Sequence, residues 1–160
     1  MLRLVPFAER HLTERYVSWL NDPVVTRYSE QRHRRHTLAS CRAYWESIAA
    51  PDRFWAIELD GRHIGNITAT VDARNGVADL AILIGERDAQ GHGHGLTAWV
   101  QAIRESGARK ITAGTMATNV PMLRLFEKSG MQIAGRRARH YLWEGQEVDM
   151  VMAECFPDRG

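Results

Sequence analysis

This chain has few cysteines, no long uncharged run and no large excess of charge. Its two cysteines, Cys41 and Cys155, cannot build a disulfide framework, so we expect two reduced thiols, as is typical of cytoplasmic proteins. No uncharged run reaches the roughly 18 residues of a membrane-spanning helix. Residues 1–10 carry charges where a signal peptide would be apolar. These absences predict a cytoplasmic protein without a membrane partner.

The balance of charges also limits the partners. There are 21 lysines and arginines against 19 aspartates and glutamates, and the net charge of +2 provides no general field for nucleic acid. Hydrophobic residues make up 44% and charged residues 25%, which are proportions of an ordinary folded protein. The 160 residues contain no repeat and no low-complexity linker, so we expect one domain over residues 1–160.

Strand and helix signals alternate in an order that predicts a mixed α/β (α+β) sheet. The expected strands cover residues 2–6, 54–59, 63–71, 77–84, 110–116, 131–141 and 147–155. The expected helices cover residues 12–20, 37–49, 95–106 and 120–129, with a further helical turn at 24–29. The strand at 77–84 is nearly continuously apolar, so we expect it to be covered on both faces. The result is a mostly antiparallel sheet of six to seven strands with about four helices.

A glycine-rich loop follows that apolar strand. Residues 90–95 (QGHGHG) alternate glycines, which lets backbone N–H groups point into one concavity beside the start of a helix. Such a loop suits a phosphate or pyrophosphate, although a flexible turn has the same composition. The following Leu96-Thr97 does not match the ending of a P-loop. The GxGxG spacing, with no acidic residue on the next strand, does not match a dinucleotide fold either.

Two phrases together resemble a known family. Gln90, Gly93 and Gly95 form a Gln-x-x-Gly-x-Gly pattern that is similar to the acetyl-coenzyme A signature of the GNAT N-acetyltransferases. Residues 119–131 (NVPMLRLFEKSGM) are similar to that family's Asn-x-x-(Ser/Ala/Met)-x-x-Leu-Tyr-Glu-Lys-x-Gly-Phe phrase. Residues 19–28 (WLNDPVVTRY) look like the Rim-type branch. That branch includes ribosomal-protein N-terminal acetyltransferases and enzymes that acetylate nucleotide-linked amino sugars.

The resemblance implies the GNAT fold, with a central splay between the fourth and fifth strands. The pantetheine of acetyl-coenzyme A would pair in that gap as an added strand does, and the loop N–H groups would hold the pyrophosphate. The residues implied to contact this co-substrate are Ile82, Leu83, Ile84, Gln90, Gly91, His92, Gly93, His94, Gly95, Asn119, Met122 and Phe126. Asn119 could instead serve only as a helix cap. The His-x-His of the loop lacks matching carboxylates or cysteines, so we expect no metal.

Asp79 is the candidate general base. It is the charged residue of an otherwise apolar strand, where burial would raise its pKa toward the value that deprotonating an ammonium ion requires. The alternative is an aspartate at a wet strand edge. Glu86 and Glu30 are fallback bases. Aspartate is shorter than the glutamate of related enzymes, so a bridging water would complete the proton transfer.

The general acid and the acceptor are less defined. Phe126 stands where the family commonly has a tyrosine that protonates the leaving thiolate. Either solvent or another hydroxyl, with Tyr28 and Tyr141 as the candidates, then serves as the acid, or the acid is dispensable. The basic segments 32–36 and 136–140 would border an acceptor channel and suit an anionic amine, unless both are ordinary solvated loops. We expect Tyr28, Glu30, Arg32 and Tyr141 to contact the acceptor.

The sequence therefore predicts an acetyl-coenzyme A dependent N-acetyltransferase in which a small-molecule primary amine attacks directly. A nucleotide-activated amino sugar is the favoured acceptor. The N-terminus of a ribosomal protein is the alternative acceptor, and a non-catalytic coenzyme A sensor is the alternative class. The last strand could also pair across a homodimer.

Overall fold

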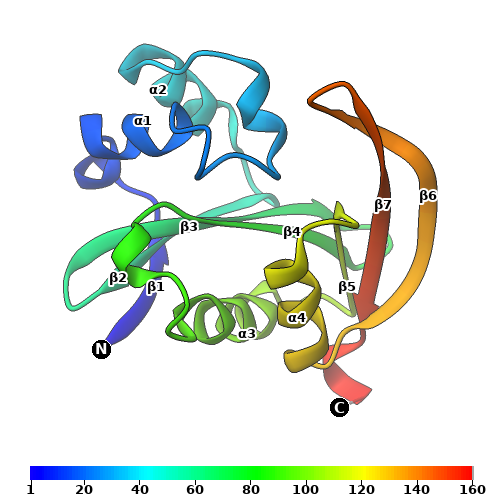
Figure 1. The fold of residues 1–160 in the computed structure, drawn as a ribbon. Coiled ribbons are helices and arrows are strands. Elements are labelled where there is room, and N and C mark those ends of the chain that lie inside the picture. Colours follow the sequence, from blue (N-terminus) through cyan, green and yellow to red (C-terminus); the bar gives the residue numbers. More distant parts are fainter. Residues whose placement is uncertain (160) are drawn as a thin grey trace.

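Within residues 1–159, which the computed structural model describes, seven strands form one sheet in the order β1-β2-β3-β4-β5-β7-β6. The strands are β1 (Leu2–Pro6), β2 (Arg53–Leu59), β3 (Arg62–Asp72), β4 (Val77–Ile84), β5 (Lys110–Met116), β6 (Gln132–Trp143) and β7 (Gln146–Cys155). The helices are α1 (Glu14–Leu20), α2 (Leu38–Ser47), α3 (His94–Ser106) and α4 (Val120–Lys128). Helices α1 and α2 lie on one face of the sheet and α3 and α4 on the other (Figure 1).

The centre of the sheet opens between two strands. Strands β4 and β5 are parallel, and they pair only from Val77–Asp79 to Lys110–Thr112. Beyond Asp79, β4 continues to pair with β3 while β5 continues to pair with β7, so the two central strands separate. The other strand pairs are antiparallel. The expected mixed sheet with a central splay is confirmed.

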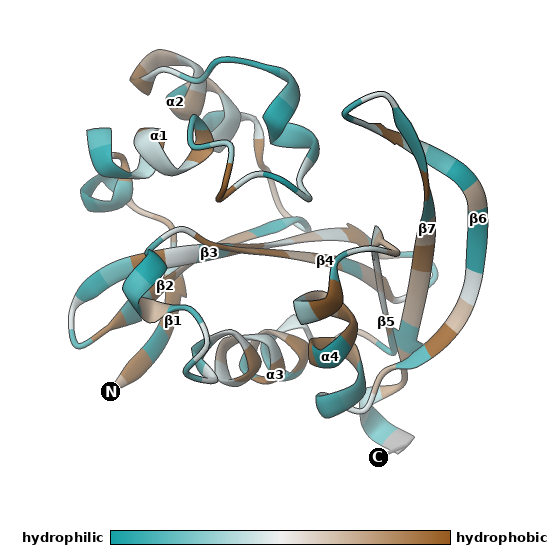
Figure 2. Ribbon diagram, viewed as in Figure 1, coloured by the Kyte–Doolittle hydropathy of each residue, from teal (hydrophilic) through white to brown (hydrophobic). Residues whose placement is uncertain are grey.

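Two apolar clusters hold the layers together. The larger lies between the sheet and α3 and α4, where Trp99 and Phe126 have no exposed surface and their ring centroids are 6.3 Å apart. The smaller joins α1 and α2 to β1 and β2 around Phe7 and Trp19. Hydrophobic residues accordingly follow β3 and β4, whereas the segment leading into α2 is hydrophilic (Figure 2). Burial of this apolar surface is the main stabilising contribution to the fold.

Two local expectations were wrong. Residues 24–29 form hydrogen-bonded turns rather than the expected helical turn. The stretch is short and begins with β-branched residues after Pro23, so the few hydrogen bonds it could form do not offset the cost of helix nucleation. Strand β4 is not covered on both faces: Ala78 and Leu80 are buried, whereas Asp79 and Ala81 are exposed. Alternation along a strand therefore directs Asp79 and Ala81 away from the core, toward the α1–α2 side.

The loop between α1 and α2 is held by side-chain hydrogen bonds. Asn21 Nδ2 donates to the His36 carbonyl oxygen (2.9 Å), and the His36 N–H donates to Asn21 Oδ1 (2.8 Å). The tip of the β6–β7 hairpin reaches the same loop, as Figure 1 shows at the upper right. There Trp143 Nε1 donates to the Arg27 carbonyl oxygen (2.8 Å), and Arg32 donates to the Leu142 carbonyl oxygen (2.8 Å). Residues distant in sequence thus enclose one side of the site.

Candidate active site

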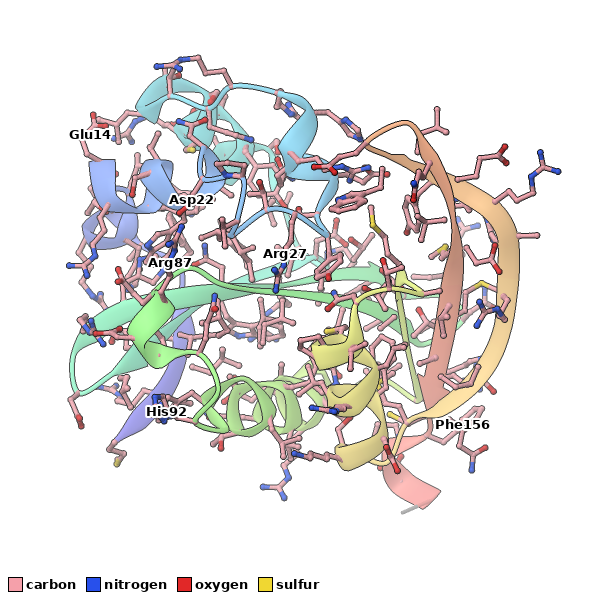
Figure 3. All side chains as sticks on the ribbon, viewed as in Figure 1. Glu14, Asp22, Arg27, Arg87, His92 and Phe156 are labelled. Carbon is pink, nitrogen blue, oxygen red and sulfur yellow. The ribbon has the colours of Figure 1, made fainter. Side chains whose placement is uncertain are left out.

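The glycine loop presents free backbone donors at the start of α3. Gly91 (φ +78°) and Gly93 (φ +82°) adopt the left-handed conformation that favours glycine, and a Cβ on either would meet no atom within 4 Å. Among residues 1–159, no acceptor bonds the N–H groups of residues 91–96. Unpaired N–H groups and the positive end of a 13-residue helix together favour a bound anion. His92 is exposed at the outer side of this loop (Figure 3).

The opening between β4 and β5 provides unpaired strand edges beside the loop. Alternate residues of the segment 80–84 turn their peptide groups toward the gap, where β5 no longer pairs with them. Gln90 Nε2 donates to the Ile84 carbonyl oxygen (3.0 Å), which ties the loop to the end of β4. An extended ligand with amide groups can pair along such an edge. The loop and gap therefore fit a molecule that carries a pyrophosphate on an amide-containing arm.

The second phrase lies on α4, and its residues have different surroundings. Asn119 caps the helix: its Oδ1 accepts from the Met122 N–H (3.3 Å), and its Nδ2 donates to Thr115 Oγ1 (3.0 Å). Met122 is half-buried and packs against the larger cluster. Phe126 is fully buried, so its ring supports α4 from the core and offers no surface to a ligand in this structure. The capping alternative for Asn119 is confirmed, while a contact with the co-substrate stays a prediction.

Asp79 lies at the point where the sheet opens. It is the last β4 residue paired with β5, and Thr112 Oγ1 donates to its Oδ1 (2.7 Å). Its side chain is accessible to solvent at the surface, yet the surrounding protein removes enough water to raise its pKa, and the Thr112 hydrogen bond lowers it by less. A carboxylate with a raised pKa on an accessible face can accept a proton near neutral pH.

Glu86 has lost the freedom to act as a base. Arg15 holds both of its carboxylate oxygens, and Trp19 Nε1 donates to Oε1 (3.2 Å). The Arg15 hydrogen bond holds the pKa of Glu86 below its usual value. Gly85 makes this arrangement possible, because a Cβ at that position would overlap the Trp19 ring. This fallback is therefore structural.

A cavity of about 160 Å³ lies on the same face of the sheet as Asp79. We call it the acceptor pocket; its lining residues are Tyr16, Leu20, Ser29, Gln31, Arg34, His36, Ser40, Cys41, Tyr44, Phe54, Asn66, Thr68, Ala81, Ile82 and Leu83. Ala81 follows Asp79 on the same face of β4, about 7 Å along the strand. The pocket thus reaches the strand edge of the gap at Ala81, two residues beyond Asp79, which does not itself line the pocket.

Tyr141 is brought to this region by an irregularity in β6. The partners of Arg137 and Tyr141 on β7, Met150 and Val148, are separated by one residue, whereas Arg137 and Tyr141 themselves are separated by three. Arg139 has φ +56° within this bulge. Burial is the largest cause of the raised pKa of Tyr141, and the negative charges of Glu30 and Asp79 raise it further. Tyr141 therefore lies within electrostatic reach of both Glu30 and Asp79.

The remaining acceptor residues are dispersed around the pocket. Arg32 is paired with Glu30 (2.8 Å), which also contacts His33 (2.8 Å). Tyr28 lies under the Arg27 guanidinium, 5.0 Å from the ring centre. None of Tyr28, Glu30, Arg32 and Tyr141 lines the acceptor pocket itself. The sequence analysis instead missed Tyr16, Tyr44, Phe54, Asn66 and Thr68, which look like ordinary core or strand residues in the sequence.

The arginines of the two basic segments, 32–36 and 136–140, are only partly paired with carboxylates. In the second, Arg136 pairs with Asp149 and Arg139 with Glu147, whereas Arg137 has no carboxylate partner among residues 1–159, so this rim keeps part of its charge. The acids stand on β7, opposite the bulge, where the sequence does not reveal the pairing. In the first segment, Arg32 pairs with Glu30, whereas Arg34 and Arg35 have no carboxylate partner among residues 1–159.

The described residues form neither a metal site nor a membrane-spanning helix. No group of three or more His, Cys, Asp or Glu side chains there could hold a metal ion. Within residues 1–159, no helix has both the length and the apolar character needed to cross a membrane. Cys41 and Cys155 are both free thiols, and burial raises the pKa of each.

Comparison with solved structures shows where this fold occurs. A spermidine N-acetyltransferase from Vibrio cholerae, in complex with CoA and spermine, matches with a TM-score of 0.87 and 17% identity over 98% of this chain and 96% of that one. An N-acetyltransferase from Staphylococcus aureus Mu50 matches with a TM-score of 0.80 and 17% identity, covering 98% of both chains. A GNAT-family acetyltransferase from Streptococcus pneumoniae matches with a TM-score of 0.79 and 20% identity, covering 98% of this chain and 99% of that one.

At such low identity these matches establish the fold. No match was found among the curated proteins. A protein-family model described as an acetyltransferase (GNAT) domain, however, matches residues 1–132. These residues include the splayed strand β4, the glycine loop and the α4 phrase. The chain belongs to the GNAT acetyltransferase family.

Proposed function

We propose that this protein, as one domain over residues 1–160, transfers the acetyl group of acetyl-coenzyme A to a primary amine. The observation that supports this most directly is the run of unbonded N–H groups at residues 91–96 beside the open edge of β4. The loop suits the pyrophosphate and the edge suits the pantetheine amides. Ile82, Leu83 and Ile84 would pair with the pantetheine, while Gln90 to Gly95 would surround the phosphates.

In the proposed reaction the chain supplies a base, an acid and hydrogen-bond donors. Bound acetyl-coenzyme A provides an activated acetyl group as a thioester. Asp79 takes a proton from the ammonium form of the acceptor through a bridging water, and the neutral amine nitrogen bonds to the acetyl carbon as the carbon–sulfur bond breaks. A backbone N–H of Ile82 or Leu83 stabilises the oxygen as it becomes negative. Tyr141, whose raised pKa keeps it protonated, gives a proton to the leaving sulfur, and the second proton that the nitrogen loses as the amide forms returns to Tyr141.

For the acceptor we propose a nucleotide-activated amino sugar. The acceptor pocket offers hydroxyl and amide groups together with Arg34 and His36, and no carboxylate of the described residues lines it. These groups suit the hydroxyls of a sugar and disfavour a polycation. The Vibrio cholerae structure holds spermine, so the charge of this pocket argues for a different acceptor here. The resemblance of residues 19–28 to the Rim-type branch, which includes enzymes that acetylate nucleotide-linked amino sugars, supports the same acceptor class.

The proposal also covers location and assembly. Two free thiols fit a cytoplasmic protein. The last strand, β7, is paired with both β5 and β6, so the expectation that it pairs with a second copy was wrong. Strand β6 ends the sheet instead, so a second copy could pair along its outer edge. Sedimentation velocity at micromolar protein distinguishes this homodimer from a monomer.

The central test is titration with coenzyme A by calorimetry, followed by a thiol-release assay with a panel of amines. We expect saturable binding and thiol release that depends on the amine. Absence of binding up to about 1 mM coenzyme A would rule out the proposed function. Binding without turnover on any amine would favour a coenzyme A sensor, a class that Phe126 in place of tyrosine makes worth testing. Turnover only with peptide amines would identify a protein N-terminus as the acceptor.

A further inference from the structure

A second cavity, of about 390 Å³, adjoins the acceptor pocket. We call it the arginine pocket; it is lined by Leu20, Asn21, Pro23, Thr26, Arg27, Arg32, Arg34, Arg35, Trp143 and Glu144. Its walls come from the α1–α2 loop and from the tip of the β6–β7 hairpin, which Figure 1 shows approaching each other. The hydrogen bond from Trp143 Nε1 to the Arg27 carbonyl oxygen joins these walls.

The positive charge in this pocket is not neutralised by the protein. Within residues 1–159, Arg27, Arg34 and Arg35 have no carboxylate partner, and Arg32 alone of the four pairs, with Glu30. Glu144 is the single carboxylate in the walls. Nearby surface arginines differ. Arg87, for example, pairs with Asp22 at 2.9 Å (Figure 3). Guanidinium groups that gather at a cavity without partners create a field that attracts an anion.

The chemistry of the walls favours phosphate over a simple carboxylate. Each guanidinium presents a planar fork of N–H donors that matches phosphate oxygens, and several forks can share the oxygens of a diphosphate. The indole of Trp143 is held by its hydrogen bond to Arg27, so its ring is available as a fixed flat wall for a planar base. The volume lies in the range of pockets for small ligands. A nucleoside diphosphate combines all of these features.

The arginine pocket also lies in the right place for an acceptor. Leu20 and Arg34 line both cavities, so the two adjoin through a shared wall. The loop donors at residues 91–96 lie on a different part of the chain from the arginine pocket, so the two anion-binding regions are distinct. A ligand whose diphosphate occupies the arginine pocket can extend an amine past Arg34 toward Ala81.

We propose that the arginine pocket binds the nucleoside diphosphate portion of the acceptor, with Arg27, Arg34 and Arg35 holding the phosphates. The inference rests on the proposed acetyltransferase function and assigns the part of the acceptor that the acceptor pocket is too small to hold. Arg34 and the pocket volume set the specificity for phosphorylated over free amino sugars. The pocket would thereby account for the lack of carboxylate partners at Arg34 and Arg35 of the first basic segment among residues 1–159.

The test measures binding of uridine diphosphate by calorimetry in the presence of saturating coenzyme A, which blocks the glycine loop. The pocket variant is Arg27→Gln with Arg35→Gln. The matched control is Arg74→Gln with Arg104→Gln, two exposed arginines outside the pocket that also lack a carboxylate partner. We expect the pocket variant to weaken uridine diphosphate binding about tenfold or more, and the control to change it less than about twofold. Binding to the wild-type protein should weaken as salt is raised.

The outcomes separate this inference from the proposed function. Failure of the wild-type protein to bind uridine diphosphate, or equal binding by the pocket and control variants, would overturn the inference even if coenzyme A binds. A kinetic arm uses thiol release: the pocket variant should raise KM for a nucleotide-linked amino sugar while leaving KM for the same free amino sugar unchanged. Equal effects on both sugars would also contradict it. Failure of the wild-type protein to bind coenzyme A would instead count against the acetyltransferase proposal.

Discussion

Single residues at this site differ mainly in how far the protein shields them from water and which groups they contact. Asp79 remains accessible but is desolvated enough to raise its pKa. Glu86, a few residues later on the chain, has its pKa lowered by Arg15. Two carboxylates near one another in the sequence are therefore adapted to different tasks, and only the first suits proton transfer.

Replacing Asp79 with asparagine tests its role as a base. The change is nearly isosteric and keeps an acceptor for Thr112, so the fold should persist. We expect kcat/KM at neutral pH to fall about a hundredfold. The deficit should shrink as pH rises toward the pKa of the acceptor amine, because the amine then loses its proton unaided. An unchanged rate across the pH range would remove Asp79 from the mechanism.

The Thr112→Val variant gives an independent reading of the same group. The Thr112 hydrogen bond favours ionised Asp79, so its loss should raise the pKa of Asp79 further. A base must be ionised to act, and the acidic limb of the kcat/KM profile should move to higher pH. Measurement of that profile for both proteins checks the shift. An acidic limb that moves to lower pH would contradict the assignment.

His63 predicts a pH dependence of stability. Burial lowers its pKa to about 4, and its Nε2–H donates to Asn66 Oδ1 (2.7 Å). Below pH 6.5, the ordinary pKa of histidine, His63 is protonated in the unfolded chain but stays neutral in the folded protein. The free energy of unfolding therefore falls as pH drops from about 6.5 toward 4. From pH 7 to pH 5 this group should remove about 2 kcal/mol.

Urea unfolding at the two pH values measures this loss, with His63→Gln as the comparison because glutamine retains an N–H donor for Asn66. The variant should lose less stability by about 2 kcal/mol over the same interval. An identical loss in both proteins would show that other groups are responsible.

At the scale of elements, the start of α3 combines a loop, a helix end and a strand edge. The loop glycines keep side chains away from the free N–H groups, and Gln90 fixes the loop to β4. Gly85 and Gly95 flank this arrangement but have different surroundings. The first is packed against Trp19, whereas the nearest atom to a Cβ on the second would be 3.9 Å away, on Ile84.

The pair Gly95→Ala and Gly85→Ala separates binding from folding. At Gly95 the added methyl fits the fold, and alanine within a helix should stabilise by roughly 0.5–1 kcal/mol. The same methyl stands among the N–H donors, so coenzyme A affinity should fall about tenfold. At Gly85 the methyl overlaps Trp19, and we expect a destabilisation of about 1–3 kcal/mol. Thermal unfolding and calorimetry with coenzyme A measure both effects. Unchanged affinity in Gly95→Ala would argue against ligand contact at this turn.

For the whole molecule, the open sheet is the feature that only ligand binding can complete. Strands β4 and β5 part after Asp79, and each is supported only on its outer side from there on. The α1–α2 layer and the β6–β7 tip close over the opposite end (Figure 1). A ligand that fills the gap would join the two halves of the sheet, and under the proposed function its acetyl group would lie between the glycine loop and the acceptor pocket.

Hydrogen exchange can follow that joining. With saturating coenzyme A, we expect slower exchange of amides in residues 80–84 and 91–96, because the ligand supplies the hydrogen-bond partners that the chain lacks. Strand β2, which is paired on both sides, should not change and serves as the internal control. Protection confined to residues 21–36 would place coenzyme A elsewhere and contradict the assignment.

The amino-acid sequence by itself determined most local structure and the co-substrate loop. Strand β4, the hairpin at Asp60-Gly61 and the helix capped by Asn119 follow from periodicity and capping chemistry, which act over a few neighbouring residues. The glycine loop is likewise a contiguous motif. The helical turn expected at 24–29 does not form, because the weak helix propensity of these residues does not offset the cost of helix nucleation.

Only the tertiary structure decided which charges are free and which side chains meet. Arg139 and Glu147, or Trp143 and Arg27, come together through the β6–β7 hairpin and its approach to the α1–α2 loop. The pairing of β4 with its neighbours places Asp79 on the exposed face of the sheet. The bulge in β6 determines the position of Tyr141. These outcomes depend on contacts between distant residues, whose energies no local pattern encodes.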